Sequence, residues 1–145
     1  SIQKCRTKEG LYSYYMGGGR TRVEGAAGRL TLCELALTLW GAGSKKTLRK
    51  ALQISFQHLD RLERVRKYDD HADRYQNGGF FFWYDLHGQS EAIRFLRDRG
   101  SAKSMIRRVL SIAEIDGAWV DSHELGRPYG TAMALLVLNR CSGVK

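Results

Sequence analysis

The chain has 145 residues and 43% of them are hydrophobic, so it can bury the core of one folded domain, and this composition disfavours disorder. Its formal net charge of +9 favours acidic partners. The basic residues are, however, mixed with acids along amphipathic stretches, which is typical of solvated helix faces. This distribution disfavours nucleic acid as a partner. No apolar run approaches the roughly 18 residues of a membrane span, and three widely spaced cysteines without a C-x-x-C pair indicate neither a metal site nor a compartment.

Five helices are predicted along the chain. Those near 24–41, 80–97 and 129–141 are rich in small residues, which allow neighbouring helices to approach closely. Those near 44–66 and 101–114 are amphipathic. The helix near 44–66 has Ser44 as its N-cap and one apolar stripe, made of Leu48, Leu52, Phe56, Leu59 and Leu62.

A short motif precedes each helix that is rich in small residues. It consists of a polar turn-former, a glycine, a spacer and an aromatic residue, as in Glu9-Gly10-Leu11-Tyr12, Asn77-Gly78-Gly79-Phe80 and Asp116-Gly117-Ala118-Trp119. The links at 42–43 and 98–100 are short, whereas those at 67–79 and 116–128 are long and polar. Short links predict antiparallel helical hairpins, and a unit repeated at tens of residues is typical of a helical array.

The motif Asp116-Gly117-Ala118-Trp119, followed by "YGTAMALL", resembles the repeats of the terpenoid cyclase and protein prenyltransferase superfamily. In that superfamily inner and outer helices alternate in an α/α toroid. The resemblance implies an all-α, toroid-like array of about two and a half repeats, forming a single domain over 1–145. The glutamine that the superfamily carries four residues before the glycine is replaced here by Arg6, Arg74 and Ala113.

A complete ring of that superfamily contains more hairpins than this chain. We therefore expect part of a larger ring, an open arc, or two associated copies. An open arc leaves apolar faces at its ends, and such faces usually find a partner. The expected partners are thus the remaining repeats of a longer chain or a second copy.

All the long loops lead into the N-terminal ends of the predicted inner helices, so they share one rim of the array. The ionisable residues collect at this rim. Candidate catalytic residues are His71, His87, His123 and Asp85. Candidate ligand-binding residues are Asp69, Asp70, Asp73, Tyr84, Asp121, Glu124 and Arg127.

Imidazole nitrogens together with carboxylate oxygens suit a divalent metal such as zinc or manganese. The candidate ligands are Asp70, His71, His87 and His123. Prenyltransferases of the resembled superfamily bind zinc through Asp, Cys and His, but no cysteine lies near these histidines, and "YDDHAD" does not match the cyclases' D-x-D-D motif. The alternative is that Asp69 and Asp73 cap turns and the histidines make ordinary hydrogen bonds.

Two functional hypotheses follow. The first is a ligand-binding or scaffold module whose polar rim recognises an acidic or carbohydrate-like ligand. The second is a metal-assisted or glycan- or isoprenoid-processing enzyme that uses the histidines and aspartates of the rim. Nucleic-acid binding rests on charge alone and ranks below both.

Overall fold

The computed structural model describes residues 2–14, 16, 21–67 and 82–145. In these ranges the chain is helical and forms no strand, apart from an isolated bridge between Arg6 and Tyr12. The elements are η1 (Ile2–Cys5), α1 (Val23–Leu39), α2 (Lys45–Gln57), α3 (Leu59–Arg64), α4 (Phe82–Leu96), α5 (Arg99–Ser111) and α6 (Gly126–Ser142). The predicted all-α class is confirmed.

Each predicted helix has an observed counterpart, but the bounds differ; the helix predicted near 101–114, for example, is observed as Arg99–Ser111. The helix predicted near 44–66 begins after Ser44, whose hydroxyl caps it, but it breaks at His58 into α2 and α3. The helix predicted to begin at 129 begins at Gly126 instead. Pro128 then lies in the first turn, where its missing N–H leaves no hydrogen bond unmade.

The predicted apolar stripe of α2 and α3 faces the core, except at one residue. Its four leucines are buried, but Phe56 is only half-buried, and Ser55 lies fully buried beside it. The Ser55 hydroxyl oxygen lies 2.7 Å from the Thr31 hydroxyl oxygen and donates to the carbonyl of Ala27 at 2.6 Å. A polar group can occupy this position because α1 provides its hydrogen-bond partners.

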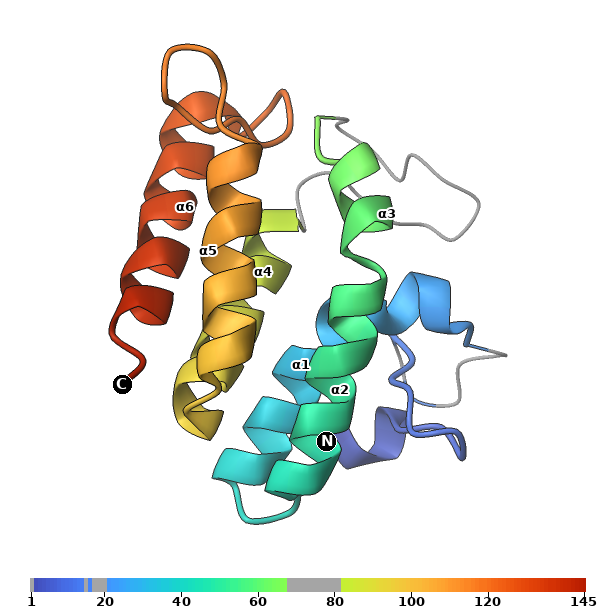
Figure 1. Ribbon diagram of the computed structural model, residues 1–145. Helices are drawn as coiled ribbons and strands as arrows, with labels where there is room; N and C mark the ends of the chain where they lie inside the picture. Colours follow the sequence, from blue (N-terminus) through green and yellow to red (C-terminus); the bar gives the residue numbers. More distant parts are fainter. Residues whose placement is uncertain (1, 15, 17–20, 68–81) are drawn as a thin grey trace.

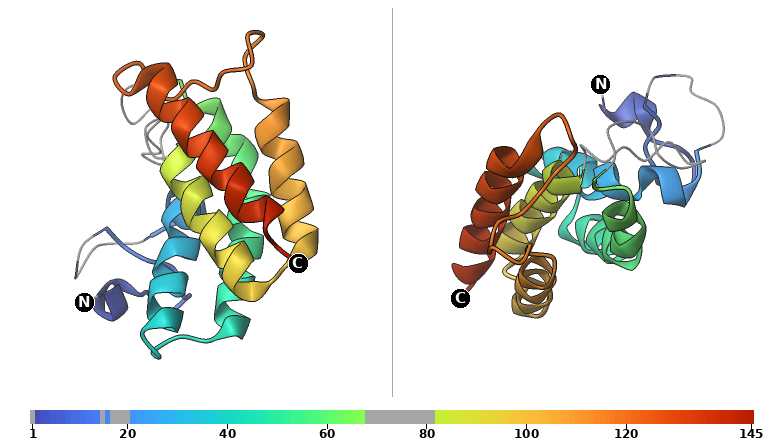
Figure 2. Two further views of the ribbon diagram at one scale, coloured as in Figure 1. Left: turned by 90° about the vertical axis from the view of Figure 1, so that its left-hand side faces the viewer. Right: turned by 90° about the horizontal axis from the view of Figure 1, so that it is seen from above.

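The long helices lie in two rows (Figures 1 and 2). Helices α1, α4 and α6 form one row, in which α4 packs against both neighbours. Helices α2 and α5 lie on one side of that row, with α2 against α1 and α5 against α6. The links at 40–44 and 97–98 are short, so each reverses the chain, and α1, α4 and α6 run in the same direction.

Small residues set the spacing within the row. A Cβ atom at Gly28 of α1 would lie 1.9 Å from the Oδ2 atom of Asp85 in α4. A Cβ atom at Gly88 of α4 would lie 3.2 Å from Cδ1 of Leu32 in α1. The predicted close approach of these helices therefore occurs; a side chain at position 28 would displace Asp85, whereas one at position 88 would require Leu32 to shift by a few tenths of an ångström.

Two of the predicted glycine-aromatic motifs form the same backbone bend, at 7–12 and at 114–119. In each bend the first residue donates its N–H to the carbonyl of the fifth, at 2.8 Å in both, and the fourth donates to the carbonyl of the first. The fourth residue is a glycine with positive φ, +82° at Gly10 and +79° at Gly117. The third copy, at 77–80, lies outside the described residues.

The aromatic residue that ends each bend is buried against a helix. The hydroxyl of Tyr12 donates to Oε1 of Glu34 in α1 at 2.6 Å. The indole Nε1 of Trp119 donates to the carbonyl of Val109 in α5 at 2.7 Å. Each bend is thus anchored to the helical rows by one large side chain that is both packed and hydrogen-bonded.

Candidate functional site

The N-terminal ends of α4 and α6 lie toward one end of the molecule, together with the loop at 112–125, and the N-terminal end of α1 points toward the same end (Figure 1). We call this the loop end. The opposite end, the short-link end, carries the links at 40–44 and 97–98 and the C-terminus. The parallel direction of the three helices places their positive dipole ends together at the loop end.

Asp85 lies in the first turn of α4 and is buried against α1 at Gly28. Burial raises its pKa to about 8, because an ionised carboxylate loses its hydration there, and the charge of Arg29 offsets part of this rise. The side chain is therefore mostly protonated at neutral pH. A protonated carboxyl group can donate as well as accept a hydrogen bond.

Asp121 is a second buried carboxyl group at the loop end. Burial raises its pKa to about 6, and the backbone N–H of Ser122 and the charge of Arg66 act in the opposite direction. Its position depends on Gly130 of α6, where a Cβ atom would lie 2.6 Å from the carbonyl oxygen of Trp119 and 2.8 Å from the backbone nitrogen of Asp121. The loop therefore rests directly on the helix backbone.

Tyr129 in the first turns of α6 connects these groups. Its pKa is raised by burial and then by the nearby ionisable groups of Asp121, Tyr84 and Asp85. Tyr129 and these three neighbours come from α4, α6 and the loop before α6, and we call them the rim cluster. Tyr84 is half exposed and gives the cluster a side open to solvent.

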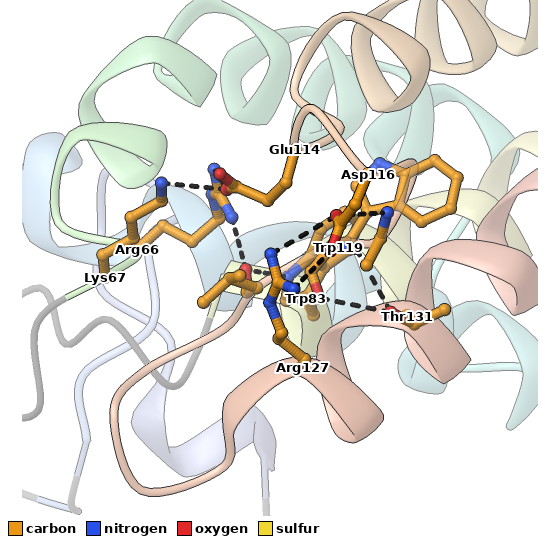
Figure 3. Close-up of polar contacts among 10 residues, drawn as sticks. Arg66, Lys67, Trp83, Glu114, Asp116, Trp119, Arg127 and Thr131 are labelled. Carbon is orange, nitrogen blue, oxygen red and sulfur yellow. Dashed lines mark hydrogen bonds and ion pairs between the residues drawn. The ribbon is translucent and has the colours of Figure 1, made fainter.

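The loop at 112–125 is fixed by a set of charged and aromatic side chains (Figure 3). Arg66 and Trp83 both donate to the carbonyl of Val120, Trp83 at 3.0 Å. Lys67 pairs with Glu114 at 2.9 Å, and this hydrogen bond is the main reason that the pKa of Glu114 is lowered.

Two further contacts join the loop to α6 (Figure 3). The backbone N–H of Trp119 donates to the Thr131 hydroxyl at 3.2 Å. Arg127 forms an ion pair with Asp116, and the hydrogen bonds that the Asp116 carboxylate accepts lower its pKa. The predicted ligand-binding residue Arg127 thus has a structural partner within the loop end.

The other predicted site residues are distributed as follows. His123 and Glu124 are exposed on the loop before α6. His87 is half-buried on α4, with its Nε2 atom 3.7 Å from Glu91, whose carboxylate also pairs with Arg140 at 2.6 Å. The remaining four predicted residues lie outside the described residues: Asp69, Asp70, His71 and Asp73.

Within the described ranges no three His, Cys, Asp or Glu side chains come together to hold a metal ion. The predicted zinc or manganese site includes Asp70 and His71, which these ranges do not contain. All three cysteines are free thiols, and burial raises the pKa of Cys33 and of Cys141 to about 11. Both thiols are therefore protonated at neutral pH and are poor metal ligands.

Sequence reasoning missed three residues of this site, Arg29, Arg66 and Tyr129. Tyr129 follows the loop by less than one helical turn, and this closeness to the polar loop could have identified it as a candidate site residue. Arg66 occurs in a stretch rich in other basic residues, and Arg29 is the only basic residue between Arg22 and Lys45. Nothing in the sequence distinguishes them from solvated side chains.

No helix among the described residues is both long enough and apolar enough to cross a bilayer. Comparison with protein-family models, with curated proteins and with solved structures found no match. The rim cluster and the arrangement of the helices are therefore the observations from which a function is argued.

Proposed function

We propose that this chain is a ligand-binding module of α/α-toroid hairpins whose loop end binds a hydroxyl-rich, carbohydrate-like ligand. The observation that carries the proposal is the rim cluster. Tyr84 and Asp85 of α4 and Asp121 of the loop before α6 all lie close enough to Tyr129 of α6 to raise the pKa of its phenol. Ionisable groups with perturbed pKa values that gather at one end of a fold mark a functional-site candidate.

The two rows of helices support the toroid part of the proposal. Parallel inner helices with outer helices on one side are what a sector of such a ring requires, and the bends at 7–12 and 114–119 have the same hydrogen bonds. Leu135 and Leu136 of α6 are 54% and 42% exposed at the end of the inner row. In a longer array the next inner helix would cover this face.

The chemistry of the rim cluster favours a neutral, hydroxylated ligand over an acidic one. Sugar hydroxyls need partners that both donate and accept, which the phenols of Tyr84 and Tyr129 supply. The half-exposed ring of Tyr84 adds a flat apolar face of the kind that stacks on sugars. An anion would gain from the helix N-terminal ends and from Arg29, but the carboxylate of Asp121, whose pKa is about 6, opposes it at neutral pH.

A glycan-processing enzyme is the second candidate, because the pKa values of Asp85 and Asp121, about 8 and about 6, both lie near neutrality. Such a pair can divide the roles of general acid and general base. Both carboxyl groups are buried, however, so a substrate would have to reach them through a rearrangement of the loop end. Binding through Tyr84, which is half exposed, and Tyr129, which is partly exposed, needs no such step.

The test uses maltohexaose, cellohexaose, xylohexaose and chitohexaose as probes in saturation-transfer NMR and calorimetry. At least one should bind, and Tyr84→Ala and Tyr129→Phe should each weaken its binding tenfold or more, since a lost stack or hydrogen bond costs about 1.4 kcal/mol or more. Asp60→Asn, at an exposed carboxylate of α3, should leave binding unchanged.

Two results would separate the candidates or reject both. Release of new reducing ends that Asp85→Asn abolishes would replace the binding module by the enzyme. Failure of all four probes to bind, with the helical content intact, would reject carbohydrate recognition at the loop end.

A further inference from the structure

The short-link end exposes large apolar side chains that the helical rows do not use. Leu39 at the end of α1 is 65% exposed and Trp40, the next residue, is 88% exposed. The other two tryptophans, Trp83 and Trp119, are buried and hydrogen-bonded through their indole N–H groups. A lone indole in full contact with water at a chain reversal is a costly position unless something covers it.

A hollow of about 890 Å³ lies beside this apolar corner. Its walls combine apolar and basic side chains from α1, α4 and the C-terminal segment, among them Leu39, Phe95, Arg94, Arg97 and Lys145. The ammonium nitrogen of Lys45 lies 5.7 Å from the centre of the Phe95 ring, which joins the start of α2 to the same surface. The apolar patch is thus framed by cations.

The charge around this patch is strongly one-sided. The segments 39–50, 91–103 and 139–145 meet at the short-link end (Figures 1 and 2) and carry ten basic and two acidic residues. Both acids are already engaged. Glu91 pairs with Arg140 at 2.6 Å, and Asp98 caps α5 through the N–H of Ser101 at 3.0 Å. Whatever covers the patch must therefore be anionic and must accept apolar side chains.

We propose that the short-link end is a peripheral contact surface for an anionic lipid bilayer. Trp40 and Leu39 enter the boundary between headgroups and acyl chains, and the surrounding lysines and arginines lie at the level of the lipid phosphates. The aliphatic Leu39 and the open apolar hollow favour lipid over nucleic acid. Nucleic-acid bases stack on aromatic rings, but they offer a leucine side chain no apolar environment comparable to acyl chains. The contact is made from one side, and it leaves the loop end facing solution.

The experiment measures sedimentation of the 145-residue chain with phosphatidylcholine vesicles, with or without about one third phosphatidylserine. The chain should sediment only with the anionic vesicles, and added salt should release it. Tryptophan emission should shift to shorter wavelength on binding and become protected from iodide. Because Trp83 and Trp119 are already buried, this change reports on Trp40.

The variants assign the contact to named side chains. Trp40→Ser should remove the emission change and most of the sedimentation. Lys45→Gln with Lys46→Gln should weaken partitioning about fivefold for each lysine removed. Matched controls at the loop end are Ile115→Ser, an exposed apolar side chain, and Arg22→Gln with Arg64→Gln, and these should bind like the unchanged protein.

Several outcomes would overturn the proposal. One is equal sedimentation with neutral and anionic vesicles, and another is full binding by Trp40→Ser. Concentration-dependent protection of Trp40 from iodide without lipid would assign the patch to a second copy of the chain. Failure to bind vesicles, together with tight binding of oligo(dT) that Trp40→Ser abolishes, would assign it to nucleic acid. None of these results bears on the loop end, so the two proposals fail separately.

Discussion

Asp85 shows how a single glycine determines the chemistry of a carboxyl group. Its side chain occupies the space that a Cβ atom at Gly28 would need, and it is removed from water between α1 and α4. The charged form is disfavoured there, which raises the pKa to about 8. The folded protein therefore holds a proton on Asp85 that the unfolded chain, with an ordinary aspartate, releases near pH 4.

We predict that this proton makes the protein less stable as the pH rises. The folded-state pKa is the higher one, so the stabilisation is complete below about pH 4 and is lost up to about pH 8, at roughly 1.4 kcal/mol per pH unit. Asp121 contributes with the same sign only up to about pH 6. Urea unfolding at pH 6, 7 and 8 should therefore isolate Asp85.

Asp85→Asn removes the titrating group, and the decline between pH 6 and 8 should flatten in this variant. Asp60→Asn, at an exposed carboxylate, serves as the control and should keep the slope of the unchanged protein. The same slope in Asp85→Asn as in the unchanged protein would show that Asp85 does not bind the proton.

The sequence directed attention to Tyr84, Asp85 and Asp121 because each lies near the start of a predicted inner helix. It could not show that Asp85 and Asp121 are buried. Burial depends on which face of α1 presents Gly28 and on how closely the loop approaches Gly130, and both are tertiary facts. Arg127 was selected by the same reasoning, and its contact with Asp116 is local to the loop end.

Among the elements, the bend at 114–119 and helix α6 pack against each other as one unit. Gly130 allows the backbone of 119–121 to lie on α6, while Trp119 and Thr131 exchange hydrogen bonds across the contact. Here backbone meets backbone, so neither partner can move aside by changing a rotamer. A substitution at Gly130 should therefore destabilise the fold more than a substitution at a glycine whose neighbour is a flexible side chain.

We predict that Gly130→Ala destabilises the protein by about 1–3 kcal/mol, because the new methyl group would meet backbone atoms at 2.6–2.8 Å. Gly143→Ala is the matched control, since the nearest atom to its Cβ would be the Asn139 carbonyl oxygen at 3.7 Å. Urea unfolding of both variants measures the difference. Equal stabilities would show that the loop moves away from α6 easily.

Most helices could be predicted because their signals are local. Ser44 gives a capping hydroxyl and the leucines of α2 give a stripe that faces the core. The break at His58 and the early start of α6 could not be predicted, because the apolar spacing continues across His58 and Pro128 is compatible with either side of a helix start. The matching bends at 7–12 and 114–119 follow from the glycine that both motifs share.

At the scale of the whole molecule, the inner row ends in an uncovered apolar face. Helix α6 is apolar or small around most of its circumference, and α4 and α5 cover only part of it. Leu135 and Leu136 are left on the surface. A helix with this composition is expected to be enclosed on more sides than the described residues provide.

We predict that the chain associates reversibly through this face. Analytical ultracentrifugation should show a concentration-dependent increase in mass, and Leu135→Gln with Leu136→Gln should weaken the association at least tenfold, about 1.4 kcal/mol. Leu110→Gln, at an equally exposed leucine of α5, should not. A monomer at all concentrations would mean that the face needs no partner.

The carbonyl of Val120 receives hydrogen bonds from Arg66, just before residues 68–81, and from Trp83, just after them. The chain just after α3 and the first turn of α4 are therefore both tied to one backbone atom of the loop before α6. A substitution that removes either donor leaves the carbonyl with the other, so the loop should lose its attachment to the helices in two steps rather than in one.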